Sequence, residues 1–67
     1  MQLSARNQLK GKVKSVHVDG LMAEIVVDVG GQELTSVITR KSAEALKLAA
    51  GHDVTVVIKS TEVMLAV

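Results

Sequence analysis

The sequence contains no cysteine, no proline and no aromatic residue. Without cysteine, the chain can form neither a disulfide nor a cysteine-ligated zinc site. Without Phe, Tyr or Trp, it lacks the side chains on which single-stranded nucleic acids stack their bases. A net charge of +1 also gives no strong field for polyanions. We therefore expect no nucleic-acid partner.

Long apolar runs are missing as well. None exceeds five residues, whereas a membrane-spanning helix needs about 20. The N-terminus lacks the apolar core of a signal peptide. These absences predict no membrane association, and together with the lack of cysteine they favour a cytoplasmic location.

Hydrophobic residues nevertheless make up 48% of a chain of only 67 residues. A chain of this length buries only about 60% of the surface that it exposes when unfolded, so one small core is the most it can form. Because disulfides are excluded, self-association is the remaining common way to stabilise such a core. The composition therefore predicts one domain, residues 1–67, that forms an oligomer.

Most of the chain alternates between apolar and polar residues with a period of two, which is typical of strands. The expected strands are residues 9–18, 21–29, 32–39, 54–59 and 63–67. Asp19-Gly20 and Gly30-Gly31 are turn signals between the first three. Within 9–18 the alternation slips by one residue, and this slip predicts a β-bulge or bend.

Residues 40–50 are the exception, because their apolar residues recur near the helical spacing of 3.6. Thr39 or Ser42 would cap the start of this helix, and Gly51 would end it. Three strands, a helix and two further strands follow the order of an OB-type barrel. The sequence thus predicts a mainly β, five-stranded Greek-key barrel with one short helix between strands three and four. An open α+β sheet is the alternative.

No set of side chains has the spacing of a catalytic or metal site. His17 and His52 are the only histidines, and neither has a Cys, Asp or Glu at the spacing of a metal site or a catalytic triad. The seven acidic residues are scattered, and Gly30-Gly31 precedes a strand, whereas a phosphate-binding loop precedes a helix. We therefore predict no enzymatic activity, no cofactor and no metal ion.

Three polar clusters lie at or near the ends of the expected strands. They are residues 4–8, the group Thr35, Ser36 and Thr39, and residues 59–61. Taken singly, they are better explained as a solvated segment, a helix cap and a polar turn. If a barrel brought them together, their hydroxyl, guanidinium, ammonium and backbone N–H groups would suit a small oxyanion.

The segments 4–11 (SARNQLKG), 35–38 (TSVI) and 58–64 (IKSTEVM) together resemble the molbindin (Mop) family of small molybdate- and tungstate-binding proteins. The resemblance covers essentially the whole chain. It implies an OB-type fold, a homohexamer built as a trimer of dimers, and oxyanion sites at subunit interfaces.

Carried over position by position, the resemblance implies an oxyanion site made of Ser4, Arg6, Thr39, Lys59 and Ser60. Arg6 and Lys59 would balance a dianion, and the hydroxyls would donate neutral hydrogen bonds. Ser4 and Arg6 of one chain are expected to meet Thr39 and Lys59 of a neighbour. The expected function is cytoplasmic binding of molybdate or tungstate for molybdenum storage or homeostasis. The alternative is a small oligomeric protein-interaction module of OB-like fold without anion specificity.

Overall fold

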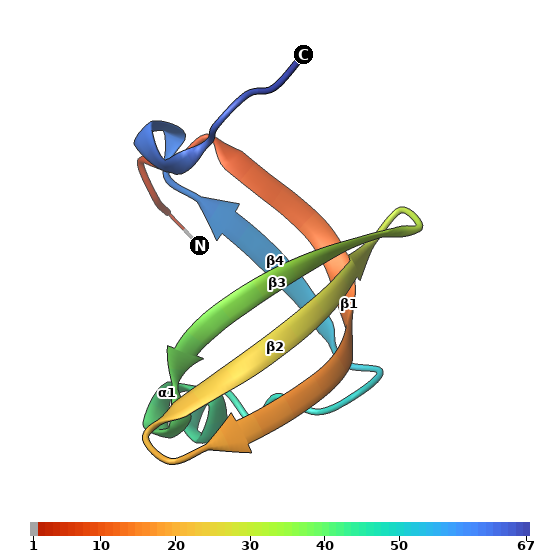
Figure 1. Cartoon of the computed structure of the whole chain (residues 1–67), viewed down its shortest axis with the longest axis vertical. Coiled ribbons are helices and arrows are strands. Elements are labelled where there is room, and N and C mark those ends of the chain that lie inside the picture. The colour runs from red at the N-terminus through yellow and green to blue at the C-terminus, as the bar shows by residue number, and fades with distance from the viewer. Residues whose placement is uncertain (1) are drawn as a thin grey trace.

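A computed structural model of the chain describes residues 2–67. Its elements are β1 (Asn7–Asp19), β2 (Met22–Val29), β3 (Gln32–Thr39), α1 (Arg40–Ala45), β4 (Asp53–Ile58) and the 3₁₀ turn η1 (Ser60–Glu62). The strands form one antiparallel sheet in the order β3-β2-β1-β4, and this sheet is strongly curled (Figure 1). No helix among the described residues is long and apolar enough to cross a membrane.

The long strand β1 pairs with two neighbours. Its first half pairs with β4, beginning with Asn7 opposite Ile58, and its second half pairs with β2. The register with β2 shifts between Val13 and Ser15, which confirms the irregularity predicted from the slip in alternation. An extra residue in one strand bends it, and β1 is therefore able to serve both halves of the curled sheet (Figure 1).

The core is small and lies inside this curl. Its buried side chains are Val13, Ala23, Ile25, Val27 and Ala43. Three of them are alternate residues of β2, because successive side chains of a strand point to opposite faces. Val54 and Val56 of β4 pack against the same cluster but remain half-buried. These three residues form the inner face of β2.

The helix is shorter than the predicted range 40–50. It ends at Ala45, and Lys47 takes a left-handed conformation with φ 54°. The N–H of Leu48 donates to the carbonyl oxygen of Ala43 at 3.1 Å, and that of Lys47 to Glu44 at 3.0 Å. These two bonds form a Schellman motif, and Leu48 then packs against the core. Packing of Leu48 therefore ends the helix before Gly51, although Ala49 and Ala50 have a high helix propensity.

Thr39 is the N-cap of α1, as one of the two predicted alternatives had it. Its Oγ1 accepts a hydrogen bond from the Ser42 N–H at 3.1 Å. We expect Thr39→Ala to lower the free energy of unfolding by about 1 kcal/mol, the usual effect of losing a cap. Urea unfolding followed by circular dichroism measures this loss. Thr39→Ser keeps the hydroxyl, and an equal loss in that variant would contradict the capping role.

Residues 63–67 form no strand, so the prediction of a fifth strand is wrong for this chain by itself. Beyond η1 the chain runs away from the sheet, and its C-terminus lies far from α1 (Figure 1). Alternation and β-branched residues indicate that a segment can be a strand, but a strand also needs an edge with which to pair. Here the segment pairs with no strand of the described sheet.

Candidate functional site

The start of β1 and the end of β4 lie side by side, although they are far apart in the sequence. Asn7 is paired with Ile58, and the Asn7 Nδ2 group donates to the Ile58 carbonyl oxygen at 3.2 Å. The segment before β1 and the turn after β4 therefore meet at the same end of the molecule (Figure 1). Two of the three polar clusters found in the sequence lie at this junction.

A pocket at this junction, here called the junction pocket, holds three of the five predicted site residues. Ser4, Lys59 and Ser60 line it together with Leu3, Ala5, Val57 and Thr61. The polar side chains of this lining are three hydroxyls and one ammonium, and it contains no carboxylate. Hydroxyls and ammonium groups donate hydrogen bonds, and bonds between an ammonium and an oxyanion are charge-assisted. The junction pocket is therefore chemically suited to a small oxyanion.

The tight turn η1 sets the position of the cationic residue. Lys59 immediately precedes η1, and its carbonyl oxygen accepts a hydrogen bond from the Glu62 N–H at 2.8 Å. This bond closes the turn, so that Lys59, Ser60 and Thr61 all face the same pocket. The polar turn that the sequence offered for residues 59–61 is confirmed, and it places the three side chains together.

Four pocket residues were not part of the predicted site: Leu3, Ala5, Val57 and Thr61. Thr61 adds a third hydroxyl, and Val57 adds an apolar wall. Val56 and Ile58 point toward the core, whereas Val57 lies on the opposite face of β4. Its exposed fraction is 38%. A valine on the outward face of a half-buried strand was the signal in the sequence that this face is partly covered.

The other two predicted residues lie outside the junction pocket. Arg6 is exposed and follows Ala5, a pocket residue, directly in the chain. Thr39 lies at the opposite end of the sheet, paired with Met22, where its hydroxyl also donates to Ser42 Oγ at 2.8 Å. The end of the third strand therefore does not converge with Ser4 in a single chain.

Ser4 and Lys59, which the prediction assigned to two different chains, line the same pocket of one chain. The pairing between residues 7–12 and 53–58, which brings them together, is not visible in the sequence. Of the five predicted residues, Thr39 lies farthest along the sheet from this pocket. The division of the site between chains stays a prediction.

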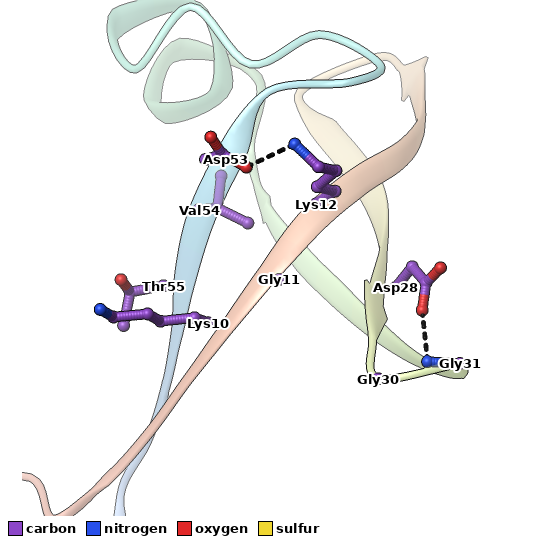
Figure 2. A pocket seen from close by; sticks show the side chains of 9 residues that line it. All are labelled: Lys10, Gly11, Lys12, Asp28, Gly30, Gly31, Asp53, Val54 and Thr55. Carbon is purple, nitrogen blue, oxygen red and sulfur yellow. Dashed lines mark hydrogen bonds and ion pairs between the residues drawn. The ribbon is translucent and has the colours of Figure 1, made fainter.

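A second hollow lies between β1, the start of β4 and the Gly30-Gly31 turn (Figure 2). Lys12 Nζ contacts Asp53 Oδ1 at 2.7 Å, and Asp28 Oδ1 accepts a hydrogen bond from the Gly31 N–H at 2.9 Å. Two lysines and two aspartates line this hollow, so their charges cancel. It is therefore a poorer site for a dianion than the junction pocket.

The Lys12 ion pair lowers the pKa of Asp53, first through the hydrogen bond and then through the charge of the ammonium. A carboxyl group whose pKa is lowered in the folded state stabilises the fold at every pH above its ordinary pKa of 3.8. This contribution is lost as the pH falls through the pKa of the folded state. Both side chains are exposed, so the effect is small.

We therefore expect Asp53→Asn to make unfolding slightly less dependent on pH below the ordinary pKa of the carboxyl group. Acid titration followed by circular dichroism measures this dependence. Asp19→Asn, at the turn between β1 and β2, is the control. An acid unfolding curve of Asp53→Asn that matches the parent chain would show that the ion pair is broken in solution.

The architecture is an OB-like fold: a curled antiparallel sheet with one short helix between β3 and β4. The chain belongs to the TOBE domain family, whose model matches residues 3–65. It is 47% identical over 66 residues to molybdenum-pterin-binding protein 1 of Clostridium pasteurianum, an alignment that covers 97% of each chain. The resemblance to the molbindin (Mop) family is thereby confirmed.

Two solved structures support the same relationship. A molybdate-binding protein from Sporomusa ovata is 39% identical, has a TM-score of 0.94 and matches over 98% of each chain. The cytoplasmic molybdate-binding protein ModG, solved with molybdate bound, is 38% identical with a TM-score of 0.85. That match covers 90% of this chain and 43% of ModG.

Proposed function

We propose that this chain binds molybdate as the intact oxyanion, in the junction pocket. The observation that carries the proposal is the convergence of Ser4, Lys59 and Ser60 in a pocket whose polar side chains are hydroxyls and an ammonium. The relatives supply the identity of the anion, because those named above are called molybdenum-pterin-binding or molybdate-binding proteins.

The proposed mechanism is recognition without covalent change. Lys59 and Arg6 balance the two negative charges, and the hydroxyls of Ser4 and Ser60 donate neutral hydrogen bonds. The lining has no carboxylate to accept a strong hydrogen bond from the hydroxyl group of a protonated phosphate, so it favours a fully deprotonated dianion. Discrimination against sulfate requires a cavity matched to the larger anion. Tungstate has the charge and shape of molybdate, so the same donors bind it.

The proposed site is completed by Thr39 of a neighbouring chain in a homo-oligomer, a hexamer arranged as a trimer of dimers. In this arrangement each dianion contacts two chains, and anion binding and assembly are thermodynamically linked. The small core of the single chain supports association, because a domain with five buried side chains among residues 2–67 gains much from covering more apolar surface.

The proposed role is storage or homeostasis of molybdenum in the cytoplasm, by one domain spanning residues 1–67 that has no enzymatic activity and no cofactor. The likeness to ModG, which is described as cytoplasmic, supports the location. A protein-interaction module without anion specificity is the competing function, and the following measurement separates the two.

Molybdate is expected to raise the midpoint of thermal unfolding. A ligand that binds only the folded chain stabilises it by about 2.7 kcal/mol at a hundredfold excess over Kd. Far-UV circular dichroism is the suitable probe, because the chain contains no Trp or Tyr. Sulfate at matched ionic strength should produce a much smaller shift. Equal shifts with the two salts would indicate a general salt effect and would favour the interaction module.

A further inference from the structure

The junction pocket lies just beyond the open end of a two-stranded ladder. Residues 7–11 of β1 pair with β4 alone, because the pairing with β2 begins only at Lys12 opposite Asp28. The last pair of this ladder is Asn7 with Ile58, and the pocket residues at both ends of the chain continue directly from it. A ladder of two strands is marginally stable by itself, and its end opens readily. Backbone pairing alone therefore holds the two sides of the pocket only weakly.

Two adjacent side-chain amides fasten this end of the ladder. The Asn7 Nδ2 group donates a hydrogen bond across the ladder to the carbonyl oxygen of Ile58, at 3.2 Å. The Gln8 Nε2 group donates back along the chain to the carbonyl oxygen of Ala5, at 2.8 Å. Neither amide lines the junction pocket. Each amide thus holds the backbone of one side of the pocket from outside it.

The hydrogen bond from Asn7 acts on the peptide group that precedes Lys59. A peptide group is planar, so holding the carbonyl oxygen of Ile58 also orients the N–H group and the Cα atom of Lys59. Lys59 continues with extended backbone angles, φ −63° and ψ 134°, and its own carbonyl oxygen accepts the hydrogen bond from the Glu62 N–H that closes η1. The direction in which the ammonium group leaves the strand therefore depends on Asn7.

The hydrogen bond from Gln8 acts in the same way on the other side of the pocket. Its acceptor, the Ala5 carbonyl oxygen, belongs to the peptide group that joins Ala5 to Arg6. Gln8 is itself held in the ladder, opposite the pocket residue Val57. The segment that carries Ser4 and Arg6 is thus attached to β1 by a side-chain bond.

We propose that Asn7 and Gln8 are positioning residues of the oxyanion site. Asn7 orients Lys59, and Gln8 orients the segment before β1; neither amide contacts the anion. This inference rests on the proposed function and adds to it two uncharged residues outside the pocket. The physical reason is preorganisation, because a segment that is not held in place has to be ordered when the anion binds, and this cost is subtracted from the binding free energy.

Asn7→Leu and Gln8→Met test the proposal, because each removes an amide and keeps a neutral side chain of similar length. Each should weaken molybdate binding roughly three- to tenfold in calorimetric titration, as expected for the loss of one hydrogen bond. Gln32→Met is the matched control, because Gln32 is an exposed glutamine at the start of β3, outside the junction pocket. Its affinity should equal that of the parent chain. Circular dichroism checks each fold, and the exposed Gln8 is the position that best tolerates replacement.

A double-mutant cycle separates positioning from a general structural effect. If Asn7 acts through Lys59, Asn7→Leu causes no further loss of affinity in the Lys59→Ala chain, whereas Gln8→Met still weakens binding there. A measurement without molybdate gives the same distinction. Amide hydrogen exchange, followed by NMR, should be faster at Glu62 in Asn7→Leu and unchanged in Gln8→Met, because the Glu62 N–H donates to the Lys59 carbonyl oxygen.

The possible failures of this proposal and of the proposed function are distinct. If the parent chain binds molybdate and both amide variants bind it equally well, the positioning role is wrong and the proposed function stands. An equal loss from Asn7→Leu with and without Lys59 would also overturn the role of Asn7. If molybdate and sulfate act alike on the parent chain, the proposed function fails, and the positioning of an oxyanion site fails with it.

Discussion

Replacement of Lys59 by alanine is expected to weaken molybdate binding by more than tenfold while the unliganded chain remains folded. Lys59 is the cationic residue that lines the junction pocket. In the proposed liganded oligomer the anion lies between two chains, and loss of one partner from such a desolvated, hydrogen-bonded charge pair costs about 2–5 kcal/mol of binding free energy. The unliganded fold should tolerate the change, because the side chain is exposed. Isothermal titration calorimetry measures the affinity, and circular dichroism checks the fold.

Lys10→Ala is the matched control for this experiment. Lys10 is an exposed lysine of β1 that lines the second hollow, where carboxylates balance the ammonium groups. Its replacement removes the same charge from the chain, so any effect of net charge alone appears equally in both variants. Arg6→Ala, in contrast, should resemble Lys59→Ala. Equal affinities for Lys59→Ala and Lys10→Ala would remove the junction pocket as the binding site.

Replacement of Gly11 by alanine is expected to destabilise the chain by about 3 kcal/mol, the upper end of the usual cost of overpacking. A Cβ atom at this position would lie 2.6 Å from the Asp28 carbonyl oxygen and 2.8 Å from a methyl group of Val27. The nearest atom belongs to the backbone of β2, which cannot move without disturbing the sheet. Urea unfolding measures the loss.

Gly20→Asn separates this steric effect from the conformational freedom of glycine. Gly20 has a φ of 61°, but nothing lies within 4 Å of a Cβ built on it. Asparagine tolerates this left-handed conformation better than other residues with a side chain. We therefore expect only a small loss of stability. If Gly11→Ala were as mild as Gly20→Asn, the close approach of β1 and β2 would not exist in solution.

The strands of the meander could be predicted from the sequence because their signals are local. Alternation, the Asp19-Gly20 turn and the slip along the first strand indicated β1 to β3 and the bulge, which the structure confirms. The end of α1 could not be predicted, because it depends on Leu48 packing against a core that the sequence does not display. Whether residues 63–67 form a strand depends on the presence of a free sheet edge with which they can pair, and local sequence patterns do not show where such an edge lies.

In the candidate site, too, local features could be predicted from the sequence and long-range ones could not. Ser4, Lys59 and Ser60 were identified through motif resemblance, and the pairing of β1 with β4 brings them together. That pairing is long-range, so no local pattern in the sequence indicates that these residues lie close together in the folded chain. Thr39, in contrast, has a local role as a cap that the sequence did indicate.

The pairing of β1 with β4 also sets the order in which the molecule is built. The hairpins from β1 to β3 join neighbouring segments, whereas Asn7 and Ile58 are 51 positions apart. Closing a long loop costs more entropy than closing a short one, so long-range pairing is the slow step of folding. We therefore expect the junction pocket, whose walls flank the Asn7–Ile58 end of this ladder, to form after the hairpins.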